Sequence, residues 1–446
     1  MPHSQKPRLA AIALSGACIF ALSGCGSSDA TPEQETTDPT TTATASEQAP
    51  TTSYTSLDCA AGTTSADILK VGTILPVTGS LSFMGPSQVS GVGLAVDEIV
   101  AAGYDACTFF TDSGDGKDMT VSTASAAELI DGKVSVAIGT ASSSVTLNVV
   151  DQLAAAPIVM ISPANTAAVL SGYSDFYFRT APPDTVQGAA LGSQILSDGA
   201  ASVAFIVFND AYGTGLRDVV QATVEEAGGT VSYGASGQGQ EFPPGQATFS
   251  SEVTAALATN PDAIVVTAFD ETLAIVAELV SQGWDMTKTY YSDGNTADYS
   301  ADLEPGTLEG AQGTIPGANP ADDFKGLLSA WHESVEGGPL SDYLYAAESY
   351  DATILAALAS VKGGATDPVT IQANLAAVSG ATGGAECTTF ADCAQLIESG
   401  EEVQYRGISG VGPFNDANDP SSAFIGIYTF DGNNVPVWTS AVERDA

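Results

Sequence analysis

The feature that most constrains the fold is an alternation of strand, polar loop and helix between residues 134 and 166. The apolar run Val134–Ile138 has the length and β-branched content of a buried strand, and a helical pattern follows it as far as Pro157. A second apolar run, Ile158–Ile161, ends in the polar residues 162–166. Because a helical crossover makes the two strands parallel, both polar loops are expected at the carboxyl edge of one sheet.

These two polar loops are candidates for an anion-binding site. Ligands of open α/β sheets bind at the carboxyl ends of the strands. Ser142 and Ser143 lie in the first loop and Thr166 in the second, and Ser143 and Thr166 are each expected at a helix start. Free N–H groups at a helix start favour an anion. Serine also caps helices that bind nothing, so it is the pairing of two such loops that favours a site.

The same alternation continues along most of the chain. A first series of strands and helices begins at Ile68, and a second one occupies residues 185–292 after the extended segment Phe176–Asp184. This pattern is typical of doubly wound, parallel α/β domains. Two similar halves joined by an extended crossing predict two lobes that face a cleft. Beyond them, Tyr343–Val361 is predicted as a long amphipathic helix, and residues 423–432 predict a terminal hairpin.

The first residues resemble a bacterial lipoprotein signal. Lys6 and Arg8 precede the apolar segment Leu9–Leu22, which is too short to span a membrane, and Leu22-Ser-Gly-Cys25 matches a lipobox. The resemblance implies that residues 1–24 are a signal peptide and that the thiol of Cys25 is acylated. A plain secretory signal is the alternative.

Residues 25–57 are rich in Ser, Thr and Pro and carry almost no large apolar side chain. Such a segment cannot bury a core, so we expect a disordered tether. A lipid on Cys25 together with this tether would hold a globular body beside the membrane without inserting it.

The net charge excludes one class of partner. The chain has 12 Lys and Arg against 53 Asp and Glu, which gives a net charge of -41. Nucleic acid is not expected as a partner, because phosphate binding needs a basic face. The acidity favours solubility and would repel other anions.

The cysteine pattern predicts disulfides. Cys18 would leave with the signal and Cys25 would carry lipid, which leaves four cysteines in an exported protein: Cys59, Cys107, Cys387 and Cys393. Four cysteines allow three pairings. The short spacing of the last two favours Cys387–Cys393, and Cys59 would then pair with Cys107.

No metal or cofactor is expected. His332 is the one histidine beyond the predicted signal, and no pair of cysteines has the two-residue spacing of a zinc site. The acidic segment 112–118 lacks the spacing and the terminal Glu of a calcium loop, so we interpret it as a turn and helix cap.

Six segments, by their order and spacing, resemble the type I periplasmic solute-binding proteins of the branched-chain amino acid/amide (Leu/Ile/Val-binding) group of ABC importers. They are IGTASSSVT at 138–146, MISPANT at 160–166, FRTAPPD at 178–184, NDAYGTGL at 209–216, YSDGN at 291–295 and SYDATILAAL at 349–358. The resemblance extends from about Ile68 to Trp438.

This resemblance implies two Rossmann-like lobes that close on a ligand about three hinge crossings. It places residues 58–180 and 300–403 in the N-terminal lobe and residues 181–299 and 404–446 in the C-terminal lobe. The crossings are then expected near Arg179–Pro183, Asn295–Leu303 and Glu402–Arg406.

The resemblance also implies roles for individual residues. The carboxylate of an amino acid would be held by the loop of Ser142 and Ser143 and by Thr166, with backbone N–H groups of Ala164 or Asn165. The ligand ammonium would pair with Asp293, which could instead be a turn residue before a glycine.

The remaining walls of the predicted site come from both lobes. Tyr212 would contact the ligand, although it could equally pack within its own loop. Leu81 and Phe83 would line the pocket from the first lobe, and Phe269 and Asp270 from the second.

Some positions depart from the family pattern. Asp293 is shorter than the acid often found at the ammonium site, Asn165 is bulkier than the small residue expected, and Asp270 adds an acid near the pocket. These differences leave room for a polar or basic amino acid, an amide, or a small compound that is not an amino acid.

The sequence therefore predicts an extracytoplasmic, lipid-anchored, monomeric substrate-binding protein of an ABC importer. It would deliver a small amino acid or amide-like ligand to a membrane permease and its cytoplasmic ATPases. A lipoprotein that presents the ligand to a signalling receptor is the main alternative, and a structural lipoprotein is a further one. Enzyme activity is not expected, because the chain has a single mature histidine and no G-x-S-x-G motif.

Overall fold

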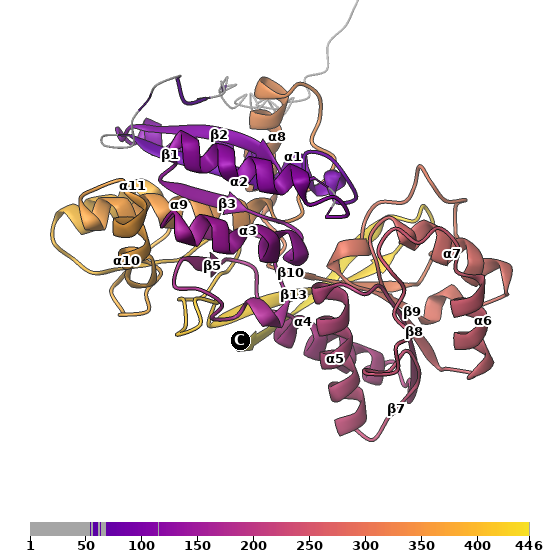
Figure 1. Ribbon diagram of the computed structural model, residues 1–446. Coiled ribbons are helices and arrows are strands. Elements are labelled where there is room, and N and C mark those ends of the chain that lie inside the picture. Colours follow the sequence, from indigo (N-terminus) through magenta and orange to yellow (C-terminus); the bar gives the residue numbers. More distant parts are fainter. Residues whose placement is uncertain (1–53, 55–56, 61–62, 64–67, 115, 446) are drawn as a thin grey trace, which may run out of the picture. The chain divides into compact units, whose positions relative to one another are not determined.

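The computed structural model describes residues 54, 57–60, 63, 68–114 and 116–445, which fall within the compact unit Thr52–Ala446 (Figure 1). The predicted signal peptide, Cys25 and most of the predicted tether lie outside the described residues. Among the described helices, none combines the length and the apolar character needed to cross a bilayer.

Strands and helices alternate as predicted over the first two thirds of the chain. The strands are β1 (Leu69–Leu75), β2 (Ala106–Asp112), β3 (Val136–Gly139), β4 (Met160–Ser162), β5 (Tyr177–Arg179), β6 (Ser202–Val207), β7 (Thr230–Tyr233), β8 (Ala263–Thr267), β9 (Thr289–Tyr291), β10 (Gln312–Pro316), β11 (Ala385–Cys387), β12 (Val403–Tyr405), β13 (Ser422–Phe430) and β14 (Pro436–Asp445). The helices are α1 (Gly85–Ala101), α2 (Thr120–Gly132), α3 (Ser143–Ala155), α4 (Asp184–Ser197), α5 (Ala211–Glu226), α6 (Ser250–Ala258), α7 (Glu271–Ser281), α8 (Asp322–Val335), α9 (Ala346–Gly363), α10 (Pro368–Val378) and α11 (Phe390–Glu398).

The first sheet is parallel throughout, in the order β2-β1-β3-β4-β5. Every residue of β1 is buried, as expected for a parallel strand with helices on both faces. Side chains of α1, α8 and α9 form the core on one face of this sheet, and side chains of α2 and α3 form the core on the other. The predicted doubly wound fold of the first half is confirmed.

The second sheet has the order β14-β13-β10-β9-β8-β6-β7. Helices α6 and α7 cover one face and α4 and α5 the other. The predicted terminal hairpin is present: β13 pairs antiparallel with both β10 and β14, so the hairpin extends the sheet at its edge. In Figure 1 the first sheet and its helices lie at the left and the second sheet and its helices at the right. The labels of β10, β13 and α4 lie between these two groups.

Two of the three predicted crossings are misplaced. Strand β10 pairs with β9 and β13, so the chain returns to the first lobe after Pro316 and not at Asn295–Leu303. Val403 and Tyr405 belong to the core of the first lobe, so the last crossing lies between β12 and β13 and not at Glu402–Arg406. The predicted lobe boundaries at residues 300 and 404 therefore shift toward the C-terminus. Strand β10 has only five residues, with a glycine inside and a proline at its end, and this pattern gives little sign of a central strand.

Two predicted helix starts also differ from the structure. Helix α9 begins at Ala346 and not at Tyr343, because Tyr345 adopts a left-handed backbone with φ of 57°. Residues Ala346–Ser360 are buried on every side, so α9 is a central helix and not an amphipathic surface helix. No α-helix follows Thr166; a short 3-10 turn at Ala168–Leu170 takes its place.

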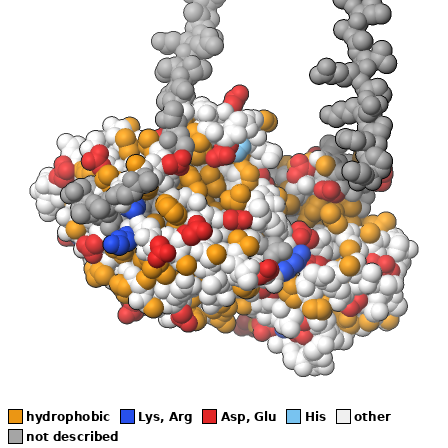
Figure 2. Space-filling view, turned by 45° about the horizontal axis from the view of Figure 1, so that its top comes forward, with side chains coloured by type: hydrophobic (Ala, Val, Ile, Leu, Met, Phe, Trp, Pro, Cys, Tyr) orange, Lys and Arg blue, Asp and Glu red, His pale blue; other side chains and the backbone are white. Residues whose placement is uncertain are grey.

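Both favoured disulfides are present, Cys59–Cys107 and Cys387–Cys393. The first joins the residues before β1 to β2, where the Cys59 amide also donates to the Thr108 carbonyl at 2.8 Å. The acidic character predicted from composition is visible on the surface: Figure 2 shows Asp and Glu side chains spread over the displayed face and basic side chains at few places.

A buried ion pair joins the end of the first sheet to the last crossing. The guanidinium of Arg179 binds Asp419 through two hydrogen bonds, of 2.6 Å from Nε and 3.1 Å from Nη2, and the two side chains are 0% and 4% exposed. The same guanidinium donates to the carbonyls of Asn165 and Ala167 at 3.2 and 3.0 Å. Arg179 therefore fixes the loop that carries Thr166.

We predict that Asp419→Ala destabilises the protein by about 3–5 kcal/mol, because it leaves the Arg179 charge buried without a partner. The matched control is Asp416→Ala, an exposed acid in the same segment, which should change the free energy of unfolding by less than about 0.5 kcal/mol. Urea unfolding followed by circular dichroism measures both. Equal effects of the two substitutions would contradict the role given to the ion pair.

Candidate functional site

A small cavity lies where the carboxyl ends of the two sheets face each other. Its volume is about 10 Å³, which is room for about one water molecule. It is lined by Leu81, Met84, Ala141, Ser142, Ser143, Ala164, Thr166, Tyr212, Phe269, Asp293, Gly294 and Tyr345. Eight of the eleven residues predicted from the sequence are in this set, and Phe83, Asn165 and Asp270 are not.

The start of α3 supplies donors on one side of the cavity. Ser142 is the N-cap and Ser143 the first residue of this helix, so the free N–H groups of its first turn face the loop. The Ser143 hydroxyl oxygen accepts a hydrogen bond from the Ala167 amide at 3.2 Å, which leaves its hydrogen available to a ligand. This arrangement suits a carboxylate.

The neighbouring loop, residues 162–166, is stabilised by hydrogen bonds within the loop. The hydroxyl of Ser162 accepts from the amides of Ala164 and Asn165 at 3.3 and 2.9 Å, so the backbone donors predicted to help a carboxylate already have an acceptor. The Asn165 side chain donates to the Ala141 carbonyl at 2.8 Å and accepts from Thr146. Asn165 thus points into the first lobe and supports the cavity wall from behind.

Asp293 is the single carboxylate in the cavity lining. It follows β9 and opens a 3-10 turn, Asp293–Asn295. One oxygen accepts from the Tyr212 hydroxyl at 2.7 Å and from Gln187 Nε2 at 2.9 Å, and the other accepts from the Tyr345 hydroxyl at 2.6 Å. Tyr345 comes from the first lobe, so this contact spans the cleft.

The electrostatics of the site favour a cation. Burial raises the pKa of Asp293, and its hydrogen bonds to Tyr345, Tyr212 and Gln187 lower it in part. Nearby Asp184 is fully buried, and burial together with the charge of Asp293 holds the pKa of Asp184 well above its usual value. No Lys, Arg or His is among the residues that line the cavity. A positive group would therefore be stabilised beside Asp293.

Aromatic and aliphatic side chains form the remaining walls. The rings of Tyr212 and Phe269 stack with centroids 5.8 Å apart and planes at 11°. A side chain at Gly294 would place its Cβ 2.7 Å from the Phe269 ring, so this position needs glycine. With Leu81 and Met84 opposite, the site offers a small apolar slot next to its polar groups.

Phe83 and Asp270 connect the lobes at the rim instead of lining the cavity. Phe83 is half-buried and packs against the hydrophobic core of the second lobe. The Asp270 carboxylate accepts from the Ser80 hydroxyl at 2.7 Å and pairs with Lys117 at 3.3 Å, and both partners are in the first lobe. A further hydrogen bond joins Ser144 to Asp210. These contacts exist only when the lobes are together.

Sequence reasoning did not single out Tyr345, Gln187 or Met84. Tyr345 lies within the segment Tyr343–Val361, which the sequence predicts as one helix, so nothing in its position points to a ligand site. The one signal in the sequence is that this residue is a tyrosine near the start of that predicted helix. The structure also offers no metal centre among the described residues, where no group of three or more His, Cys, Asp or Glu could hold an ion.

The profile of the family described as periplasmic binding protein matches residues 68–421. A chemotactic signal transduction system substrate-binding protein, BasB of Halobacterium salinarum, is 28% identical over 298 residues, which are 65% of this chain and 68% of that protein. A leucine-, isoleucine-, valine-, threonine- and alanine-binding protein of Pseudomonas aeruginosa is 29% identical over 178 residues, 36% of this chain and 45% of that protein. The match therefore spans less than half of the second relative.

Among solved structures, the leucine-binding protein LivK of Thermotoga maritima superposes with a TM-score of 0.69 at 21% identity. The superposition covers 84% of this chain and 99% of that chain. At this level of identity the likeness establishes the fold, a type I periplasmic binding fold, and nothing about the ligand.

We predict that Asp293→Asn stabilises the ligand-free protein at about pH 8 and has no effect at about pH 4. The raised pKa means that the folded protein holds the Asp293 proton more tightly than the unfolded chain does. Wild-type stability therefore falls as the pH rises from about 3.9 through the raised value, by about 1.4 kcal/mol for each unit of the shift. Asp293→Asn has no titratable group at this position, so its stability does not fall in this way as the pH rises.

Thermal unfolding at both pH values measures this difference. The exposed acid of the same lobe, Asp302→Asn, is the control and should show no such pH-dependent gain. A lower midpoint for Asp293→Asn at pH 8 would contradict the prediction.

Proposed function

We propose, because the chain belongs to the periplasmic binding protein family, that it captures a small zwitterion outside the membrane and delivers it to an ABC importer. The observation that carries this proposal is the pairing of a helix start with serine donors on one side of the cavity and a buried carboxylate without a cation on the other.

A free amino acid meets both requirements at once. Its carboxylate can accept from Ser143, Thr166 and the start of α3, and its ammonium can pair with Asp293. Charge-assisted hydrogen bonds in a site without water are the strong ones. Burial of Asp293 is unfavourable while the site is empty, and the ligand ammonium offsets that cost.

The walls of the cavity favour a small apolar side chain. Leu81, Met84 and Phe269 surround the slot, and its volume of about 10 Å³ means that the lobes would have to part to admit the ligand. The relative from Pseudomonas aeruginosa, which by its name binds leucine, isoleucine, valine, threonine and alanine, supports this class. Amide-like ligands with an ammonium group would satisfy the same donors.

Lobe closure would link capture to delivery. The contacts of Asp270 with Ser80 and of Asp293 with Tyr345 join the two lobes over the ligand, so a bound ligand favours the closed arrangement. A permease that recognises the surfaces of both lobes would then prefer the loaded protein. The cytoplasmic ATPases of the importer would supply the energy, and Cys25 would hold this chain at the membrane as a lipoprotein. This transport role requires the protein to bind and release its ligand without changing it chemically.

A sensing role is the second candidate, because BasB is by name part of a chemotactic system. The same site would then present its ligand to a signalling receptor. A deletion strain separates the roles: loss of ligand uptake supports import, whereas normal uptake with loss of the response supports sensing.

We predict that one or more small apolar amino acids raise the thermal unfolding midpoint of residues 57–446, since a ligand that binds only the folded state stabilises it by about 2.7 kcal/mol at 100 times its Kd. In Asp293→Asn the affinity should fall by about 30-fold or more, because the ligand ammonium loses a buried charged partner. Ser143→Ala should also weaken binding, whereas Asp302→Asn should leave it unchanged.

Isothermal titration gives the affinity of each variant. If no free amino acid or amide binds, the zwitterion proposal fails. If one binds with equal affinity to wild type and Asp293→Asn, the ammonium assignment fails.

We further predict that the affinity falls as the pH is lowered through the raised pKa of Asp293. The ammonium pairs with the ionised carboxylate, so at lower pH a proton must leave first, and the affinity should drop about tenfold per pH unit. Asp184, Tyr212, Tyr345 and Gln187 face this group, and the titration belongs to the coupled Asp184–Asp293 pair. Titration calorimetry from about pH 4, close to the ordinary value for Asp, to about pH 8 tests this. A constant affinity over that range for a ligand whose amine stays charged would contradict it.

A further inference from the structure

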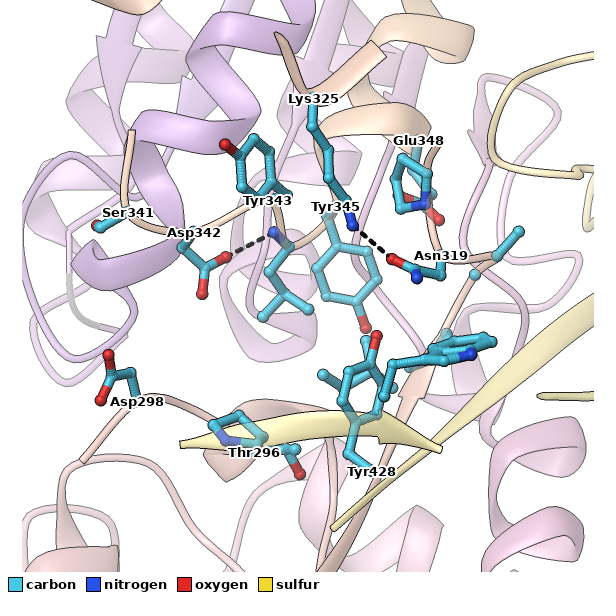
Figure 3. Close-up of a pocket in the computed structure, with 18 of the residues that line it drawn as sticks. Thr296, Asp298, Asn319, Lys325, Ser341, Asp342, Tyr343, Tyr345, Glu348 and Tyr428 are labelled. Atoms are coloured by element: carbon cyan, nitrogen blue, oxygen red, sulfur yellow. Dashed lines mark hydrogen bonds between the residues drawn. The ribbon is translucent and has the colours of Figure 1, made fainter. Parts of the chain in front are cut away.

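A second, larger cavity lies between the lobes, and Tyr345 lines both cavities. Figure 3 shows the residues around this second cavity. Its volume is about 290 Å³. One wall comes from α8, α9 and the loop between them, and the other from β10, β13 and β14. Its lining residues are Thr296, Asp298, Ile315, Pro316, Gly317, Ala318, Asn319, Pro320, Lys325, Ser341, Asp342, Tyr343, Leu344, Tyr345, Glu348, Tyr428, Val435, Pro436 and Trp438.

Glu348 is a buried carboxyl group at this cavity. It lies in the first turn of α9 and is only 4% exposed, yet no hydrogen bond from another described residue reaches its carboxyl oxygens. Gly317 makes room for it, since a Cβ at that position would lie 2.1 Å from Glu348 Oε1. Burial raises the pKa of Glu348 to about 8. A cation beside a carboxyl group that is buried in this way would stabilise its ionised form.

Aromatic side chains surround the same space. Tyr428 on β13 and Trp438 on β14 are paired in register, with ring centroids 5.5 Å apart and planes at 86°. Tyr343 and Tyr345 approach from the first lobe, as Figure 3 shows for the residues that it labels. Tyrosine and tryptophan rings attract cations over their faces, most strongly where water is excluded.

The charges at the cavity are mainly negative. Asp298, Asp342 and Glu348 line it together with one cation, Lys325. The ammonium of Lys325 donates to Asn319 at 2.7 Å and lies 5.7 Å from the centroid of the Tyr343 ring. Lys325 is thus held at that side of the cavity, and Glu348 is left without a positive partner among the described residues.

We propose that this cavity binds a small organic cation, a quaternary or protonated amine, whose charge pairs with Glu348 and whose alkyl groups contact Tyr428 and Trp438. The ligand differs from that of the first cavity, because the acids that line this site, Asp298, Asp342 and Glu348, would repel a carboxylate. The proposal does not depend on which ligand occupies the first cavity.

Tyr345 connects the two sites. It lines both cavities, and its hydroxyl donates to Asp293 in the first. Because both lobes also contribute walls to the second cavity, a cation there favours the closed arrangement. Occupation of the second site would therefore raise the affinity of the first, and the reverse, by the same factor.

Choline is the probe for the experiment, and 3,3-dimethyl-1-butanol, its uncharged isostere, is the matched control ligand. Choline added to the soluble body at about pH 8 should change the tryptophan fluorescence and release or absorb heat, while the isostere should do neither at the same concentration. Trp438 is one of three tryptophans in the chain. Trp438→Phe should remove the fluorescence change, because Trp284 and Trp331 do not line this cavity.

Substitutions separate the two cavities. Glu348→Gln should weaken choline binding tenfold or more, and Glu333→Gln, an exposed acid on α8, should not. Asp293→Asn should leave choline binding in place. Circular dichroism checks that Glu348→Gln is folded, and Trp438→Ala, which should also weaken choline binding, gives an independent variant in the terminal hairpin.

Three results would overturn the proposal. The first is the absence of choline binding at millimolar concentration, and the second is equal binding of the uncharged isostere. The third is loss of choline binding in Asp293→Asn with retention in Glu348→Gln, which would place the cation in the first cavity. None of these depends on whether the first cavity binds an amino acid.

Discussion

The buried ion pair of Arg179 and Asp419 is the interaction on which the arrangement of the site depends. It joins the last strand of the first sheet to the last crossing, two segments separated by 240 residues in the sequence. The same guanidinium fixes the carbonyls of Asn165 and Ala167 on either side of Thr166. A charge that is buried in this way tolerates few alternative positions, because any displacement leaves it without compensation. The loop of Thr166 is therefore rigid where it meets the cavity.

The two cavities share one physical feature, a carboxyl group buried without a cation. Asp293 in the first cavity and Glu348 in the second both have raised pKa values because they are removed from water. Such groups make the empty protein less stable at neutral pH. They persist in functional sites because a ligand with positive charge restores the missing partner and gains affinity from it.

Much of the first site could be predicted from the sequence, for a definite reason. Ser143, Thr166 and Asp293 each follow a predicted strand, and parallel strands bring their carboxyl ends to one edge. The predictions that missed the cavity involve side-chain direction. Asn165 is in the right loop, but its amide turns inward to Ala141. Asp270 is in the right loop of the second lobe, but its carboxylate reaches Ser80 at the rim.

The sequence by itself determined the alternation of strands and helices, the two-lobed class of fold, the disulfide pairs and which loops share an edge. The alternation and the shared edge follow from local periodicity. The disulfide pairs follow from the short spacing of Cys387 and Cys393, which leaves Cys59 to pair with Cys107. Only the tertiary structure decided that β10 belongs to the second sheet, that Tyr345 crosses the cleft to Asp293, and that Glu348 faces a second cavity. Each of these results from packing between segments far apart in the chain, which no local pattern encodes.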